Sequence, residues 1–215
     1  MKVISFSLWG NDPKYTVGAI RNGELAPKIY PGWTCRFHIG DGVPEEITSE
    51  LLKLGEVVRH RGCDWGGMFW RFLDAGKYDA FISRDTDSRL GLREKAAVDE
   101  WIKSGKDYHI MRDHPAHAFK ILGGMWGCRA GNLGDIEDLI NSYHDKREYY
   151  QVDQNFLKEV VWGRAKDNSL VHDPIFEKKP FPTKRVGFEF VGEVYDENES
   201  LNKSHTNGLK DFLKT

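Results

Sequence analysis

The chain has 215 residues with a formal net charge of −2, and 40% of its residues are hydrophobic. This length suffices for one substantial core, and the near-neutral charge argues against a general nucleic-acid binder, which carries a basic excess. No apolar run approaches the ~18 residues that cross a membrane, and the first residues form a strand pattern without a signal peptide. The odd number of scattered cysteines (Cys35, Cys63 and Cys128) indicates reduced thiols, so we expect a cytoplasmic protein.

Strand and helix patterns alternate through the first half of the chain. Apolar runs bounded by turn residues predict the strands, and amphipathic stretches predict the helices between them. Pro27 follows the first helix and is expected to kink or break it. The expected strands are 3–8, 34–39, 56–59 and 78–83, and the expected helices are 14–25, 44–54 and 66–73. This alternation predicts a mostly parallel sheet with helices on both faces, in which ligands bind beyond the carboxyl ends of the strands.

The second half of the chain is less regular. The Pro- and Lys-rich stretch 173–185 indicates an ordered loop, and the chain becomes polar after Tyr195. We interpret 196–215 as a terminal tail or the start of a linker, which leaves open that the chain is one domain of a longer protein. The expected helices are 92–104, 135–143 and 152–161, and the expected strands are 107–111, 124–128 and 169–172.

The tripeptide Asp85-Thr86-Asp87 directly follows the apolar run 78–83. Its two carboxylates lie at the carboxyl end of a buried strand, where they face the ligand crevice. Two carboxylates in this arrangement bind one hard divalent cation, Mg²⁺ or Mn²⁺, and leave positions open for substrate phosphates. An isolated Asp-x-Asp is more often a solvated turn or a helix cap, so the metal interpretation depends on the preceding strand.

Two further residues offer a third metal ligand and a charge for a leaving group. His172 ends a predicted strand, and Lys179 follows in the next loop. A histidine beside two aspartates would complete a metal site, and a nearby lysine would neutralise a departing diphosphate. Taken alone, a buried structural histidine and a solvated lysine are the commoner alternatives.

Polar residues in two predicted helices and one glycine pair add further candidates. Asp153-Gln154 begins a helix, where its side chains either complement the helix dipole or hydrogen-bond a polyhydroxylated substrate. Arg71 is a lone base among large apolar residues, and it either reaches a phosphate or sugar hydroxyl, pairs with Asp74 or extends to the surface. Gly123-Gly124 indicates that the backbone closely approaches a ligand or another strand.

Together these features resemble the glycosyltransferases of the GT-A fold over nearly the whole chain, from about Val3 to Tyr195. The first strand and turn also look like a small group within that fold that includes a glycosyltransferase domain of a chlorella virus. That likeness implies a protein of the host cytoplasm. The segments that carry the resemblance are Arg71, Ser83–Leu90, Ile121–Gly127, Gln151–Asn155, and His172 with Lys179-Pro180-Phe181.

The resemblance implies one GT-A domain over residues 1–195, with a nucleotide-binding half to about 90 and an acceptor half beyond. Asp87 and His172 would bind the metal directly, and Asp85 would contact the metal or the ribose. Asp153 and Gln154 match the residues that line the sugar in retaining members. The other implied donor contacts are Ser7, Leu8 and Tyr15 at the nucleoside, Arg71 at the sugar or diphosphate, Thr86 in the metal motif and Lys179 at the leaving group.

The implied reaction moves a hexose or 6-deoxyhexose, of the glucose or rhamnose type, from a UDP-sugar to a glycan acceptor with Mn²⁺ or Mg²⁺. Metal and basic side chains stabilise the departing diphosphate while an oxocarbenium-like state forms. A retaining enzyme of this kind lets the departing phosphate take the acceptor proton. An inverting enzyme needs a carboxylate at the acceptor hydroxyl, for which Asp153 or Asp113 would serve.

Two other functions fit parts of the pattern. A phosphohydrolase of the haloacid-dehalogenase type also has an Asp-x-Asp after a buried strand, although normally after the first strand and followed by Gly-Thr. A noncatalytic domain that binds a nucleotide or a glycan on the same fold is the second alternative. Such a domain would bind the same ligands as the enzyme without catalysing a reaction, and the residues alone do not distinguish the two.

Overall fold

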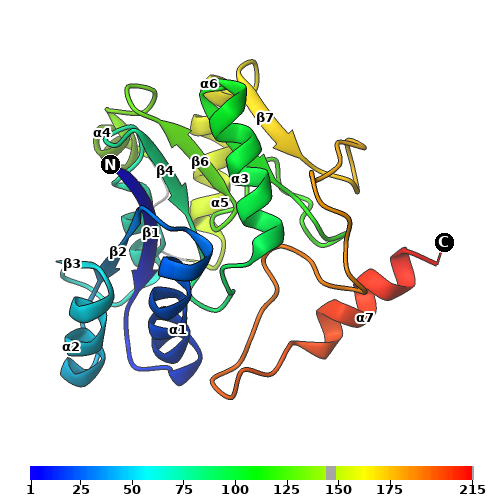
Figure 1. Ribbon diagram of the computed structural model, residues 1–215. Coiled ribbons are helices and arrows are strands. Elements are labelled where there is room, and N and C mark those ends of the chain that lie inside the picture. The colour runs from blue at the N-terminus through cyan, green and yellow to red at the C-terminus, as the bar shows by residue number, and fades with distance from the viewer. Residues whose placement is uncertain (144–148, 215) are drawn as a thin grey trace.

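A seven-stranded sheet forms the centre of the computed structural model, which describes residues 1–143 and 149–214 (Figure 1). The strands run in the order β3-β2-β1-β4-β6-β5-β7. Every pairing is parallel except those of β6, which is antiparallel to both β4 and β5. The predicted mostly parallel sheet is therefore confirmed, and the carboxyl ends of the six parallel strands lie at one edge.

The observed elements follow the predicted order closely. The strands are β1 (Lys2–Leu8), β2 (Trp33–Ile39), β3 (Glu56–Arg59), β4 (Ala80–Ser83), β5 (Tyr108–Met111), β6 (Trp126–Arg129) and β7 (Ser169–His172). The helices are α1 (Pro13–Ile29), α2 (Glu45–Leu54), the 3₁₀ helix η1 (Trp65–Phe72), α3 (Leu92–Ser104), α4 (Ile136–Ser142), α5 (Val152–Phe156), the π-helical turn η2 (Leu157–Val161), α6 (Trp162–Ala165) and α7 (Lys203–Phe212).

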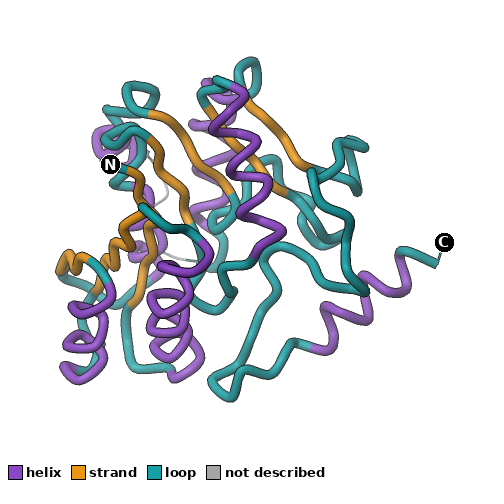
Figure 2. Tube along the Cα trace, in the orientation of Figure 1, coloured by secondary structure: helices purple, strands orange, loops and turns teal. Residues whose placement is uncertain are grey.

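Two apolar layers cover the two faces of the sheet (Figure 2). One layer packs α1, α2 and α3 on the sheet through residues such as Phe6, Phe37 and Trp101. The other packs η1 and α4 to α6 through residues such as Phe72 and Phe156. Because both faces are covered, every residue of β4 and every residue of β1 after Lys2 is buried. Among the described residues, no helix is long and apolar enough to cross a membrane.

The prediction that Pro27 breaks the first helix is wrong. Helix α1 continues through Pro27 to Ile29, and the backbone N–H of Tyr30 still donates to the carbonyl of Ala26. Pro27 is exposed in the last turn, where the missing N–H costs one internal hydrogen bond. Ala26 and Tyr30 are buried beside it, so their packing holds the turn in helical form.

The polar C-terminal stretch contains a helix that the sequence did not predict. Asn202 caps α7, since its side-chain oxygen accepts from the backbone N–H of Ser204 at 3.0 Å. Leu209 is completely buried, and the carbonyl of His205 is 2.9 Å from Nε2 of His114. Residues 196–215 therefore include an element that packs on the rest of the chain and not only a polar tail, whereas a domain boundary at 195 stays a prediction.

Leu209→Ala should release α7 from the domain. Truncating a fully buried leucine costs about 2–5 kcal/mol, and the loss falls first on the element that the side chain anchors. Amide hydrogen exchange should show reduced protection across α7 in this variant. Leu213→Ala, at the exposed end of the same helix, is the control, and equal protection in both variants would contradict the packing described for α7.

Candidate functional site

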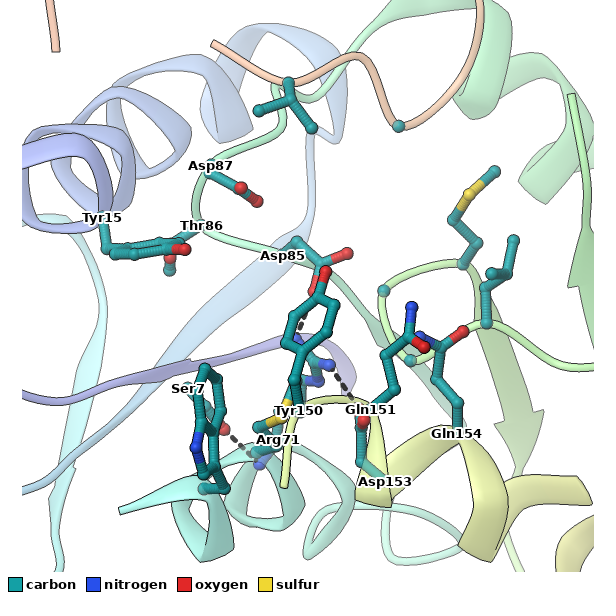
Figure 3. A pocket seen from close by; sticks show the side chains of 18 of the residues that line it. Ser7, Tyr15, Arg71, Asp85, Thr86, Asp87, Tyr150, Gln151, Asp153 and Gln154 are labelled. Atoms are coloured by element: carbon teal, nitrogen blue, oxygen red, sulfur yellow. Dashed lines mark hydrogen bonds and ion pairs between the residues drawn. The ribbon is translucent and has the colours of Figure 1, made fainter. Parts of the chain in front are cut away.

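A cavity of about 640 Å³ opens beyond the carboxyl ends of β1 and β4. It is lined by the turn after β1, by η1, by the loop after β4, by residues between β5 and β6, and by the start of α5. The segment before α7 and His205 on that helix complete its wall. Figure 3 shows the central part of this cavity, with the labelled side chains directed toward one another.

Helix α1 fixes the loop that carries Asp85, Thr86 and Asp87. The side-chain amide of Asn22 donates to the carbonyls of Thr86 and Ser88, at 3.3 and 2.8 Å. A Cβ on Gly18 would lie 2.1 Å from the Thr86 carbonyl oxygen, so only glycine permits this contact. The backbone of the loop is thus held from one side, which leaves its two carboxylates directed into the cavity (Figure 3).

Arg71 connects the two halves of the site. Its buried guanidinium pairs with Asp85 through Nη1 and with Oδ2 of Asp153 at 2.7 Å through Nη2. Its backbone N–H donates to Oγ of Ser7 at 2.8 Å, which ties η1 to the end of β1. Burial raises the pKa of the Asp153 carboxyl, and the charge of Arg71 offsets part of that rise. Of the alternatives open for Arg71, the structure shows it paired inside the cavity and not with Asp74.

Gly123 and Gly124 provide the space for this ion triad. A Cβ on Gly123 would lie 2.4 Å from both Nη2 of Arg71 and Oδ2 of Asp153. A Cβ on Gly124 would lie 2.0 Å from Oδ2 of Asp85. The close approach that the glycine pair indicated is therefore to charged side chains, which come from the two halves of the chain.

The start of α1, directly after the turn that follows β1, adds a second cation and an aromatic ring. Nζ of Lys14 lies 2.7 Å from Oδ2 of Asp87 and 4.9 Å from the ring centroid of Tyr15. Burial and the charge of Asp85 raise the pKa of the Asp87 carboxyl, and Lys14 counteracts them. Leu8 lines the cavity beside this turn.

Three predicted site residues do not line the cavity. Asp113 is fully buried between Arg93 and Arg185, which occupy its carboxylate oxygens at 2.6 to 3.0 Å. Lys179 pairs with Glu177 at 2.7 Å on an exposed loop. Both side chains are therefore engaged in structural ion pairs elsewhere.

His172 is the third, and the sheet order explains its distance from the Asp-x-Asp loop. Strand β7 stands three positions from β4, about 14 Å at the ~4.8 Å spacing of adjacent strands. Nδ1 of His172 lies 2.9 Å from Nε2 of His109, and its Nε2 lies 3.3 Å from Oε2 of Glu100. The structure thus places it in a buried polar cluster and not beside Asp87.

The structure adds residues that the sequence did not single out. Trp9, Trp65 and Tyr150 form an aromatic wall, with Trp65 centred 6.4 Å from Trp9 and 5.6 Å from Tyr150. Elsewhere in the lining, the ring of His114 lies beside those of His117 and of His205 from α7. The polar segment Arg112–Pro115, which follows a predicted strand, is the sequence signal that could have pointed to His114. Nothing in the polar sequence around residue 205 indicated that it returns to this cavity.

The donors present fit a hard divalent cation at Asp85 and Asp87. Carboxylate oxygens suit Mg²⁺ and Mn²⁺, and a cation there would offset the burial and the Asp85 charge that raise the pKa of Asp87. The described residues contain no preassembled group of three or more metal-binding side chains. The two aspartates would therefore share the ion with oxygen atoms of a ligand or water, as Mg²⁺ sites often do.

Two buried polar atoms beside the triad also lack protein partners. Oδ1 of Asp153 and Oε1 of Gln154 accept no hydrogen bond from the described part of the chain. Buried acceptors without a partner are costly unless a ligand or water satisfies them. Both residues line the cavity, so a ligand rich in hydroxyl groups would match them.

Comparison with known proteins gives matches at the level of structure. No protein-family model and no curated protein sequence matches the chain. The fold is similar to a glycosyltransferase involved in the glycosylation of the major capsid of PBCV-1, at 18% identity and a TM-score of 0.52, over 81% of this chain and 82% of that chain. It is also similar to the galactosyltransferase LgtC, crystallised with donor and acceptor sugar analogues, at 14% identity and a TM-score of 0.47, over 81% and 74% of the two chains.

A further similar structure is glucosyl-3-phosphoglycerate synthase from Mycobacterium tuberculosis in complex with Mg²⁺ and uridine diphosphate. Its identity is 13% and its TM-score is 0.49, over 79% of this chain and 68% of that chain. The sheet order and the similarity to the PBCV-1 glycosyltransferase define the GT-A fold, as the sequence predicted. The expected closer relation to a viral group has only weak support, because 18% identity establishes the fold alone.

Gly124→Ala should disturb the ion triad from the backbone side. The added methyl group overlaps the Asp85 carboxylate, and overpacking of this kind costs about 1–3 kcal/mol. Urea unfolding measures the loss, with Gly134→Ala as the control because a Cβ there meets open space. Equal stability of the two variants would show that the triad tolerates a side chain at 124.

His117→Gln should reduce the acid sensitivity of the fold. Burial lowers the pKa of His117 from 6.5 to about 3, so below pH 6.5 the unfolded chain binds a proton that the folded chain does not. As the pH is lowered, His117 therefore reduces the free energy of unfolding by up to about 1.4 kcal/mol per pH unit. Glutamine does not titrate, so it removes this dependence. Urea unfolding of both proteins from about pH 7 to about pH 5 measures the difference in slope, and identical slopes would contradict the burial of a neutral His117.

Proposed function

We propose that this protein is a glycosyltransferase that transfers a hexose or 6-deoxyhexose from a UDP-sugar to a glycan acceptor, with Mn²⁺ or Mg²⁺ as cofactor. The observation that carries the proposal is the convergence of Asp85, Asp87, Arg71 and Asp153 on one cavity at the strand ends. In an open sheet this edge is where ligands bind. The GT-A fold of known nucleotide-sugar enzymes supports the same function.

The cavity lining combines charged side chains and aromatic rings, which suit the two substrates. Arg71 and the Asp-x-Asp carboxylates, with Lys14 paired to Asp87, would hold a diphosphate and a cation. His114 and Phe190 also line the cavity, with their rings 4.5 Å apart. Burial lowers the pKa of His114, so these two rings are uncharged and suit an acceptor sugar.

The donor would lie along the turn after β1 and across the ion triad. Ser7, Leu8 and Tyr15 would contact the nucleoside. Thr86, between the two aspartates, also lines the cavity and would contact the donor there. Arg71 would contribute positive charge near the sugar and diphosphate. A bound divalent cation would supply the positive charge that stabilises the departing diphosphate. The free acceptor atoms of Asp153 and Gln154 would orient sugar hydroxyls.

Transfer with retention of configuration is the stereochemical course that we propose. An inverting enzyme needs a carboxylate that reaches the acceptor hydroxyl. Asp113 lies outside the cavity, and Asp153 is fully buried and paired with Arg71. The free oxygen of Asp153 is the one proposed here for the donor sugar, so neither carboxylate is left for the acceptor hydroxyl, whereas a departing phosphate could take the proton directly.

The phosphohydrolase alternative has no support from the topology. Its aspartates belong after the first strand, but this pair follows β4 and β1 ends in Ser7 and Leu8. The noncatalytic alternative differs from the proposal in turnover alone. An assay of donor turnover therefore separates a binding domain from an enzyme.

Asp87→Asn should abolish donor turnover. Hydrolysis of UDP-glucose and UDP-rhamnose with Mn²⁺ is expected to fall about 100-fold or more, because the charge that holds the cation is removed. Asp138→Asn, on exposed α4, is the control. The metal role would be contradicted if UDP bound the native protein in EDTA, and bound Asp87→Asn in Mn²⁺, as tightly as it binds the native protein in Mn²⁺. Tight UDP binding without turnover on a broad donor and acceptor panel would favour the noncatalytic domain.

A further inference from the structure

Lys14 at the start of α1 occupies the carboxylate that the proposed metal needs. Its Nζ lies 2.7 Å from Oδ2 of Asp87, and the two side chains are 31% and 16% exposed. The side chain of Asp12 accepts from the backbone N–H of Lys14 at 2.9 Å and so fixes the base of the lysine. The ammonium is thus anchored by its backbone, while its four-carbon stem is partly exposed and can turn.

Asp85 has a very different cation as its partner. The Arg71 side chain is only 7% exposed, and its guanidinium is held by Asp153 as well as by Asp85. Moving Arg71 would leave Asp153, which is fully buried, without its counter-ion. Moving Lys14 would leave only Asp87 without its counter-ion, and an incoming divalent cation would replace the lost positive charge. The structure therefore combines a fixed cation on one carboxylate with a displaceable cation on the other.

The ammonium and a divalent cation compete for the Asp87 carboxylate. Nζ of Lys14 already holds Oδ2, and an ammonium at hydrogen-bond distance would repel a Mg²⁺ bound at about 2.0–2.1 Å to the same carboxylate. The Lys14–Asp87 pair therefore weakens metal binding, and the metal gains both oxygens only when Lys14 moves away. The displaced ammonium, still tethered at the rim of the cavity, lies next to the place where a diphosphate would bind.

We propose that Lys14 is an exchangeable counter-ion: it pairs with Asp87 in the free protein, yields Asp87 to the divalent cation and then pairs with the donor diphosphate. This inference rests on the proposed function and assigns that site a residue to neutralise the leaving group. Lys179, which the sequence suggested for this task, is paired with Glu177 on an exposed loop.

The exchange has two consequences of opposite sign. Removing the ammonium frees Asp87, so the metal alone should bind more tightly. The same change removes a charge from the diphosphate, so UDP in the presence of metal should bind less tightly. A residue with a purely structural role would weaken both. In the native protein, metal and UDP should strengthen each other's binding, because UDP provides the new partner for Lys14.

The test compares Lys14→Met and Lys14→Arg with the native protein. Mn²⁺ binding without nucleotide is measured from the electron paramagnetic resonance signal of free Mn²⁺, and UDP binding in saturating Mn²⁺ is measured by calorimetry. In Lys14→Met, Mn²⁺ should bind about tenfold more tightly and UDP about tenfold more weakly, as expected for loss of one charge-assisted hydrogen bond. Lys14→Arg keeps the charge and should stay near native values in both.

Lys28→Met is the matched control, because Lys28 is exposed on the same helix away from the cavity. Thermal unfolding of each variant checks that the fold is intact. Unchanged or weaker Mn²⁺ binding by Lys14→Met, when the native protein binds Mn²⁺ and UDP, overturns the exchange and leaves the proposed function standing. Failure of every protein to bind Mn²⁺ and UDP overturns the proposed function and the exchange with it.

Discussion

The buried guanidinium of Arg71 is the interaction on which the site depends. It stands between Asp85, from the loop after β4, and Asp153, from the first turn of α5, and so joins the two halves of the chain. Two carboxylates this close would repel each other without a cation between them. Gly123 and Gly124 serve the same arrangement, because any side chain there would occupy the space of the charged groups. The triad is therefore built by both the side chains and the backbone around it.

The balance of charge in the cavity explains what the site can accept. Asp85, Asp87 and Asp153 face Arg71 and Lys14, an excess of one negative charge among these five side chains. A divalent cation alone would reverse that sign, and a nucleoside diphosphate would then restore it. The charges thus favour cation and diphosphate together over either one alone. The rings of His114 and Phe190, which also line the cavity, add no charge to this balance.

The sequence predicted the fold well because its signals are local. Apolar runs and caps placed β1, β3, β7 and α3 to within a residue or less, and Asp85-Thr86-Asp87 was found at a strand end. What the sequence did not report is lateral position in the sheet and tertiary packing. The step from β4 to β7 separates His172 from the Asp-x-Asp loop, and no local pattern reports strand order. Likewise Pro27 stays helical because its neighbours are buried, and α7 returns to the cavity through Leu209 and His205.

The central claim is that Asp85 and Asp87 hold a divalent cation against the diphosphate of a nucleotide. The most direct test is a crystal grown with Mn²⁺ and UDP, with anomalous diffraction collected at the manganese edge. The account predicts one strong anomalous peak at the Asp87 carboxylate, in contact with the diphosphate, with the uridine along the turn after β1 and beside Tyr15. A UDP molecule bound in the cavity with no manganese at Asp87, or manganese bound elsewhere, would contradict it.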